Sequence, residues 1–171
     1  MRIALAILIS LTFTLTGFAM GELPKAGSSA PAAGVIDFAL PDLAGNRVSI
    51  EELRGKVVFI NFWATWCPPC AAEMPAMQRL YEKMDKRKFE MLAVNEDRGG
   101  APVIKRFLGD KNYTFKILLD INNNVAYKYN ITFFPTTFII DKQGEVAATM
   151  IGAREWDSQE MIKTLNELIA K

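Results

Sequence analysis

Hydrophobic residues are spaced along this chain with two alternating periods. The run 56–63 is almost continuously β-branched and aromatic, which predicts a central strand that is buried on both faces. Directly after it, Met74, Met77 and Met84 recur with other apolar residues at helical spacing, so we expect a helix over 67–83. Methionines at this spacing are better explained by adaptable core packing than by a metal or cofactor site.

The rest of the chain predicts further strands and helices in alternation. Extended segments are expected at 35–40, 47–50, 89–95, 115–119, 136–141 and 145–151, and helices at 102–108, 124–130 and 157–170. The first two and the last two of these strands are predicted to form hairpins, because short turn sequences join them. Strands that alternate with helices and end in a hairpin plus a helix predict an α/β sandwich with a mixed central sheet.

Three short patterns indicate where helices begin. They are capping boxes at Ser49 with Glu52 and at Asp157 with Glu160, and a hydrophobic staple of Trp156 with Met161. The first predicts a brief helical turn that stops at Gly55, and the other two predict that the last helix begins near Asp157.

The N-terminus has the pattern of an export signal. Arg2 precedes an apolar run over 3–18, and the small residues Gly17 and Ala19 offer a cleavage site after Ala19. The run is only slightly short for a membrane span, so a cleaved signal and an uncleaved anchor both remain open. Either reading places the folded domain outside the cytoplasm, in the periplasm or at the outer face of the membrane.

Composition supports a single globular domain behind this signal. The chain has 171 residues, 20 Lys and Arg against 19 Asp and Glu, no histidine, and half of its residues apolar. This balance fits one domain with a substantial core and argues against a nucleic-acid binder. Residues 21–34 are rich in Ala, Gly, Ser and Pro without a hydrophobic period, as in a flexible linker. The expected divisions are a signal or anchor at 1–19, a linker at 20–34 and the domain at 35–171.

The only two cysteines, Cys67 and Cys70, lie where the central strand gives way to the helix. A disulfide that closes so short a loop removes little entropy from the unfolded chain, so it would be a poor structural crosslink. At the first turn of a helix, free backbone N–H groups and the helix dipole favour a thiolate, so Cys67 should ionise more easily than a free cysteine. Cys70 lies one turn further in and can close the ring. The pattern therefore predicts a redox-active dithiol.

Three segments together resemble the thioredoxin superfamily. They are Asn61-Phe62-Trp63-Ala64-Thr65-Trp66-Cys67-Pro68-Pro69-Cys70, Phe134-Pro135-Thr136-Thr137-Phe138, and Gly152-Ala153. Within the superfamily, the chain is most similar to exported thiol-disulfide oxidoreductases of the ResA, TlpA and CcmG type. The resemblance covers roughly residues 35–171 and implies a thioredoxin-like sandwich with an added N-terminal hairpin and an insertion around 97–129.

Glu73 lies three residues after Cys70 on the same helical face, so its carboxylate could exchange a proton with that thiol. ResA-like proteins have an active-site glutamate at this offset. The resemblance also implies that Asn61 replaces the buried aspartate of thioredoxin, which leaves Glu73 as the nearest acid. The alternative is a surface glutamate favoured by the first turns of the helix.

The resemblance implies a substrate-binding edge opposite the dithiol. Pro135 matches the cis-proline of the superfamily, which would turn the backbone of Phe134 outward to pair with an extended substrate. Phe134 is expected to close over the sulfurs or to select the substrate. Trp66 is expected to form the opposite wall, with simple packing as its alternative. Gly152 completes this predicted set.

These features predict an exported thiol-disulfide oxidoreductase that acts as a reductase without a cofactor or metal. A reductant in an oxidising compartment needs a supply of electrons, so we expect a membrane-embedded thiol donor and a protein disulfide substrate. The resemblance suggests apocytochrome c as that substrate. We expect the domain to be a monomer.

Four alternatives remain open at this point. A disulfide oxidase or isomerase would use the same two cysteines at a higher reduction potential. A redoxin-type peroxidase needs threonine or serine three residues before its cysteine, whereas Ala64 is found here. A zinc module would find only half of its ligands in Cys67 and Cys70. A noncatalytic binding role would be indicated if Cys67→Ser left the biological function intact.

Overall fold

The computed structural model describes residues 36–171. The predicted signal or anchor, the predicted linker and Val35 lie outside the described residues. The elements follow in the order β1 (Ala39–Pro41), β2 (Arg47–Ser49), η1 (Glu51–Leu53), β3 (Val57–Trp63), α1 (Pro68–Lys83), β4 (Phe89–Asn95), α2 (Gly100–Leu108), β5 (Lys116–Leu119), α3 (Asn124–Lys128), β6 (Thr136–Ile140), β7 (Val146–Ile151) and α4 (Gln159–Ala170). In this part of the chain, no helix has the length and apolar character needed to cross a membrane.

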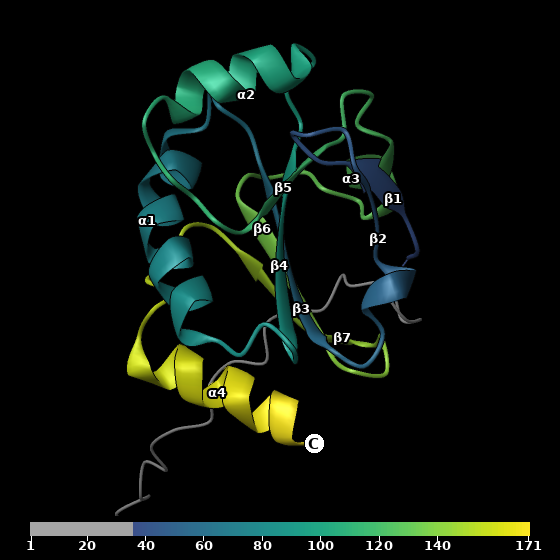
Figure 1. The fold of residues 1–171 in the computed structure, drawn as a ribbon, viewed down its shortest axis with the longest axis vertical. Helices are drawn as coiled ribbons and strands as arrows, with labels where there is room; N and C mark the ends of the chain where they lie inside the picture. Colours follow the sequence, from purple (N-terminus) through teal and green to yellow (C-terminus); the bar gives the residue numbers. More distant parts are fainter. Residues whose placement is uncertain (1–35) are drawn as a thin grey trace, which may run out of the picture.

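The predicted α/β sandwich with a mixed central sheet is confirmed. Five strands lie in the order β5-β4-β3-β6-β7, with β3 parallel to β4 and antiparallel to β6. The β1–β2 hairpin forms a separate antiparallel pair. As Figure 1 shows, α1 and α4 cover one face of the sheet, while α3 and the hairpin lie against the other. The predicted insertion comprises α2, β5 and α3, and it adds β5 to the sheet edge beside β4.

The two faces of the sheet have separate hydrophobic cores because side chains alternate along β3. Phe59 and Trp63 point into the core beneath α1 and α4, whereas Ile60 and Phe62 point into the core beneath α3 and the hairpin. All seven residues of β3 are buried, as the continuous apolar run predicts. Asn61 falls on the α1 side, where it is buried and donates a hydrogen bond to Glu73 of α1. The predicted core role of the helix methionines is confirmed, since Met74, Met77 and Met84 all lie in the α1-side core.

Two of the predicted helix starts are wrong. Ser49 belongs to β2, and no side chain caps η1, which follows Ile50. The last helix is capped by Ser158, whose Oγ accepts a hydrogen bond from the Met161 N–H at 3.3 Å. Asp157 does not cap it because its carboxylate pairs instead with Arg79 of α1, with 2.7 Å between Oδ2 and Nε.

The hydrophobic staple of Trp156 with Met161 is also wrong. With Ser158 as the cap, Trp156 lies two residues before it rather than one, so it is out of register for that motif. Its indole is fully buried and packs edge to face on Phe59 of the central strand, with 4.8 Å between the ring centroids. The side chain that sequence assigned to a local helix start is therefore part of the main core.

Candidate active site

The dithiol lies where β3 ends and α1 begins. The chain turns between Ala64 and Cys67, whose N–H donates to the Ala64 carbonyl at 3.2 Å. Pro68 and Pro69 then occupy the first two helical positions, where their missing N–H groups cost no helical hydrogen bond. Cys67 is the N-cap residue, and its Sγ accepts a hydrogen bond from the Cys70 N–H at 3.3 Å. The sequence thus places the first sulfur at the positive end of the helix.

Cys67 and Cys70 form a disulfide, with 5.3 Å between their Cα atoms. The predicted closure of this ring is confirmed. Cys67 has 5% of its surface exposed to solvent, while Cys70 is fully buried. Cys67 is therefore the sulfur that an incoming thiol or disulfide can approach.

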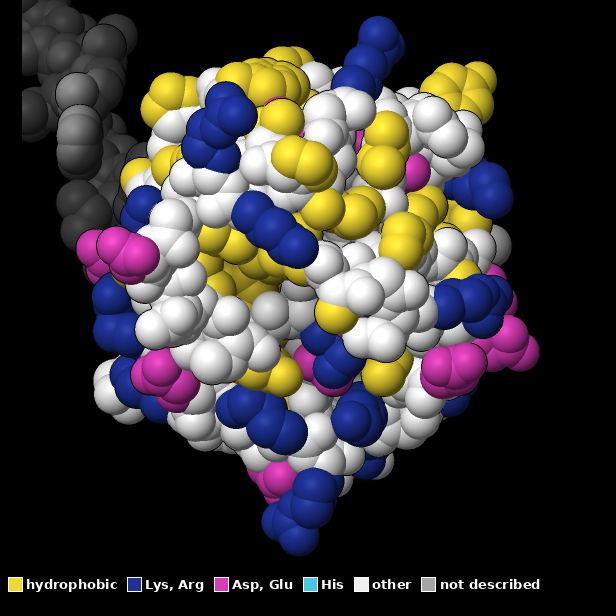
Figure 2. Space-filling model, turned by 45° about the horizontal axis from the view of Figure 1, so that its top comes forward, with side chains coloured by type: hydrophobic (Ala, Val, Ile, Leu, Met, Phe, Trp, Pro, Cys, Tyr) yellow, Lys and Arg dark blue, Asp and Glu magenta, His cyan; other side chains and the backbone are white. Residues whose placement is uncertain are grey.

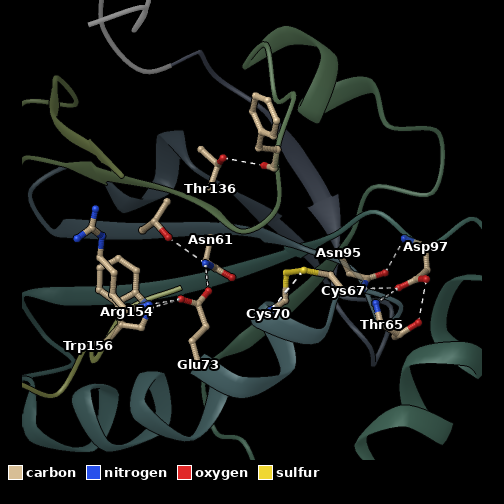
Figure 3. The surroundings of a disulfide bond; sticks show 12 residues. Asn61, Thr65, Cys67, Cys70, Glu73, Asn95, Asp97, Thr136, Arg154 and Trp156 are labelled. Carbon is tan, nitrogen blue, oxygen red and sulfur yellow. Dashed lines mark hydrogen bonds between the residues drawn. A yellow bond between two sulfur atoms is a disulfide. The ribbon is translucent and has the colours of Figure 1, made fainter. Parts of the chain in front are cut away.

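Glu73 is buried at the inner side of α1, with only 3% of its surface exposed. Oε1 accepts a hydrogen bond from Asn61 Nδ2 at 2.9 Å. Oε2 accepts two more, from Trp156 Nε1 at 2.7 Å and from the Arg154 N–H at 3.2 Å. The alternative of a surface glutamate is wrong. Figure 3 shows these donors converging on Glu73 on one side of the disulfide.

The surroundings of Glu73 act on its protonation in opposite directions. Burial raises the pKa of Glu73, whereas the hydrogen bonds from Trp156, Asn61 and Arg154 favour the ionised carboxylate and lower it in part. Asn61 also donates to Thr137 Oγ1 on β6 at 2.9 Å, which fixes the amide between helix and sheet. Among the described residues, no hydrogen bond joins Glu73 to either sulfur of the disulfide.

The predicted cis peptide bond between Phe134 and Pro135 is confirmed. The Pro135 carbonyl accepts a hydrogen bond from the Gly152 N–H at 2.8 Å, which ties the proline loop to the end of β7. Gly152 has a φ of +88°, a conformation that suits glycine and orients this N–H. Thr136 Oγ1 donates to the Phe133 carbonyl at 2.8 Å and so closes the loop from its other end.

The predicted aromatic walls meet beside the dithiol. The rings of Trp66 and Phe134 contact edge to face, with 5.6 Å between their centroids. Trp66 is 65% exposed and Phe133 is also exposed, whereas Phe134 is half-buried and packs against both cores. Figure 2 shows hydrophobic side chains spread over this end of the molecule, interspersed with basic ones. An exposed aromatic surface of this kind is suited to binding another protein.

Asp97 forms a second polar network that sequence reasoning missed. Its Oδ2 accepts hydrogen bonds from the Thr65 N–H and from Asn95 Nδ2, both at 2.8 Å, and its Oδ1 accepts one from Thr65 Oγ1 at 3.0 Å. Figure 3 places this network on the side of the disulfide opposite to Glu73. Polar residues directly after a buried strand are the signal that could have identified it, because strand ends often line functional sites.

Glu96, beside Asp97, is a buried acid without a hydrogen-bond partner among the described residues. Burial and the adjacent carboxylate of Asp120 raise the pKa of Glu96 to about 9. Asp120 is itself buried, and its oxygens accept hydrogen bonds from three N–H groups at the start of α3. Within residues 36–171, no three side chains of the types that bind metals converge on a common point.

Comparisons with known proteins agree with this geometry. The AhpC/TSA family model matches residues 31–149. The chain is 36% identical to thiol-disulfide oxidoreductase ResA of Halalkalibacterium halodurans over 99% of its own length and 93% of that protein. It is 41% identical to ResA of Geobacillus kaustophilus over 88% of its length and 84% of that protein. The crystal structure of StoA from Bacillus subtilis is similar, with a TM-score of 0.65 and 28% identity over 81% of this chain and 98% of StoA.

Proposed function

Because the chain belongs to the AhpC/TSA family and is a thiol-disulfide oxidoreductase of the ResA type, we propose that it reduces protein disulfides outside the cytoplasm. The observation that carries this proposal is the placement of Cys67. Its sulfur caps α1, accepts the Cys70 N–H, and is the accessible member of the pair beside the Phe134–Pro135 loop.

In the proposed reaction, the Cys67 thiolate attacks one sulfur of the substrate disulfide. That S–S bond breaks, the leaving sulfur takes up a proton, and a mixed disulfide joins Cys67 to the substrate. Cys70 then loses its proton and attacks the Cys67 sulfur, which releases the second substrate thiol and forms the Cys67–Cys70 disulfide. Two electrons and two protons pass to the substrate in total.

We assign Glu73 the role of accepting the proton from Cys70 in the second step. The two residues lie three apart on the inner side of α1, and the carboxylate is buried between Asn61 of β3 and Trp156. In the disulfide form Cys70 has no proton to share, so the absence of a hydrogen bond between them is expected. Catalytic hydrogen bonds often form only in the reacting complex or through one water molecule.

The substrate is proposed to lie as an extended segment against the proline loop. The surface formed by Trp66, Phe133 and Phe134 would contact its apolar side chains, and Gly152 would support the loop through Pro135. Apocytochrome c, whose paired haem-attachment cysteines must be reduced, is the proposed substrate. The electrons are proposed to come from a membrane-embedded thiol donor, since a reductase in an oxidising compartment must be recharged.

Trapping of the mixed disulfide tests this function. Reduced Cys70→Ser protein is mixed with an oxidised peptide that contains a Cys-x-x-Cys-His segment, and the covalent adduct is measured by mass spectrometry. We expect an adduct on Cys67, because the resolving thiol is absent. The matched Cys67→Ser variant should form none. Equal adducts with both variants would refute the assigned order of attack.

The reduction potential tests the direction of electron flow. Equilibration of the wild-type protein with glutathione or dithiothreitol buffers should give a value close to that of thioredoxin, about −270 mV. A value near that of DsbA, about −120 mV, would instead indicate an oxidase. Rapid consumption of hydrogen peroxide by the reduced protein would indicate a peroxidase, contrary to the proposal.

A further inference from the structure

Asp97 has a buried carboxylate that neutral groups hold in place. Its three hydrogen bonds come from the Thr65 N–H, the Thr65 hydroxyl and the Asn95 amide, and all three groups are donors to it. Within residues 36–171, none of the ion pairs includes Asp97. Three donors around an acid are the arrangement that a carboxylate anion requires, so this site suits a negative charge and has no paired cation among the described residues.

This charge lies close to the proposed nucleophile. The Thr65 N–H donates to Asp97 Oδ2 at 2.8 Å. Thr65 precedes Cys67 by two residues, so the Cα atoms of Thr65 and Cys67 are no more than about 7 Å apart. The turn from Ala64 to Cys67 keeps the intervening chain compact. Figure 3 shows Asp97 and Thr65 flanking the disulfide on its Cys67 side.

We propose that Asp97 is a positioning residue that fixes the turn before the dithiol and, through its charge, keeps Cys67 from becoming strongly acidic. The start of α1 favours the Cys67 thiolate, whereas the negative charge of Asp97 disfavours it. A thiol with a higher pKa forms a more nucleophilic thiolate, and the dithiol that contains it is a stronger reductant. Asp97 therefore biases the pair toward donating electrons, an inference that rests on the proposed reductase function.

Other ionisable groups near the dithiol do not replace Asp97 in this role. Glu73 lies on the Cys70 side of the disulfide, where it accepts a hydrogen bond from the Arg154 N–H, and the positive charge of Arg154 favours its ionised form. Glu96 is the next residue in the chain and is close enough to feel the charges of Asp97 and Asp120, and burial together with these charges keeps it neutral at physiological pH. Among the ionisable side chains of residues 36–171, only Asp97 is hydrogen-bonded to the turn that carries Cys67.

Two substitutions separate the charge of Asp97 from its hydrogen bonds. Asp97→Asn removes the charge and keeps an oxygen that can accept from Thr65, whereas Thr65→Val removes the hydroxyl and keeps the charge. Asp97→Ser is made alongside as a second neutral variant, and Asp85→Asn, at a half-buried position where the carboxylate pairs with Arg87, is the control. The pKa of Cys67 is measured from thiolate absorbance in a Cys70→Ser background.

We expect both neutral Asp97 variants to lower the pKa of Cys67 by about one unit, since a charge at ~10 Å in a partly buried site has an effect of this size. Thr65→Val and Asp85→Asn should leave this pKa within error of the parent. With both cysteines present, and at a pH above the pKa of Cys67, Asp97→Asn should shift the dithiol–disulfide equilibrium about tenfold toward the dithiol. This corresponds to a rise of ~30 mV in the reduction potential.

Two outcomes would overturn the inference about Asp97. One is an unchanged pKa in both neutral variants, and the other is an equal fall in Thr65→Val, which would assign the effect to the hydrogen bonds. These outcomes differ from a failure of the proposed function. That failure would appear in the wild-type protein, as an oxidising potential or as an absence of adduct on Cys67.

Discussion

Replacement of Glu96 by glutamine should stabilise the protein, and the gain should grow as the pH rises. Glu96 is 4% exposed, has no hydrogen-bond partner among the described residues, and lies beside the carboxylate of Asp120. In the folded protein its pKa is about 9, against 4.5 for an unperturbed glutamate. Between these two values, the folded protein holds a proton that the unfolded chain has released.

The sign and size of the effect follow from this difference in bound protons. Because the unfolded state binds fewer protons, the free energy of unfolding falls as the pH rises, by up to ~1.4 kcal/mol per pH unit. From pH 5.5 to pH 8.5 the loss amounts to about 4 kcal/mol. Glutamine cannot ionise, has nearly the same shape as glutamate, and has an N–H group that can donate a hydrogen bond to Asp120. The Glu96→Gln protein should therefore lack this loss.

Urea denaturation at pH 5.5, 7.0 and 8.5 measures the difference. The disulfide-bonded form is used so that neither thiol titrates, and Glu145→Gln, at an exposed position, serves as the matched control. We expect the stability of the wild type and the control to fall with pH relative to that of Glu96→Gln. Parallel stability curves for all three proteins would show that Glu96 is ionised in the folded state, and would refute the reasoning.

Three further predictions concern the groups around the dithiol. Glu73→Gln should shift the titration of the Cys70 thiol and slow disulfide exchange at least ~10-fold in stopped-flow assays. In the wild type, activity should fall as the pH decreases through the pKa of Glu73, which burial raises above 4.5. If neither the titration nor the exchange rate changed in the variant, Glu73 would be a structural residue. Trp156→Phe removes the 2.7 Å hydrogen bond to Glu73 and should cost about 1–3 kcal/mol in urea denaturation, whereas a neutral result would mean that the carboxylate finds another donor. Phe134→Ala should raise the KM for a protein disulfide but not for a small aromatic disulfide reagent, and equal effects on both would argue against substrate contact by Phe134 and Trp66.

The sheet and its layers were predictable because the signals that specify them extend over whole elements. The run 56–63 anticipates β3 within one residue, and 89–95 matches β4 at both ends. The other residues of β3 are apolar and carry the strand signal, so a single polar residue such as Asn61 does not change the prediction. Among the longer elements, two helix starts differ by more than one residue: Gly100 begins α2 two residues before the predicted Pro102, and Gln159 begins α4 two residues after the predicted Asp157.

The helix caps were not predictable because each depends on a single side chain with several available partners. Asp157 and Ser158 are both good capping residues, and sequence alone does not show which one is free. Arg79 lies 78 residues earlier in the chain, and its hydrogen bond to Asp157 leaves the cap to Ser158. Local patterns fail where a distant residue competes for the same group.

The residues of the candidate site also fall into two groups, those that local motifs predict and those that only distant contacts bring to the site. Cys67, Cys70 and Pro135 belong to short motifs, and Glu73 follows from its offset along the helix that Cys70 begins. Asp97 is joined to Thr65 across 32 positions, and Trp156 is joined to Glu73 across 83. Their contacts exist only because β4 and the segment before α4 end near the dithiol. Sequence therefore identifies the reacting groups, and the tertiary fold supplies the groups that surround them.

The buried acid near the dithiol lies on α1, as Glu73, and not on the central strand β3, and this difference affects the two thiols. The position where the superfamily resemblance places an aspartate on the central strand is held here by Asn61, which donates to Glu73 rather than accepting a proton. The acid thus belongs to the same helix as Cys70 and moves with it, whereas Asp97 is fixed to the turn before Cys67. In the proposed reaction each thiol then has its own carboxylate, one that can take a proton and one whose charge opposes thiolate formation. Since a group that accepts a proton and a group that only raises a pKa affect different steps, substitutions at Glu73 and at Asp97 should act independently on the rates of resolution and of first attack.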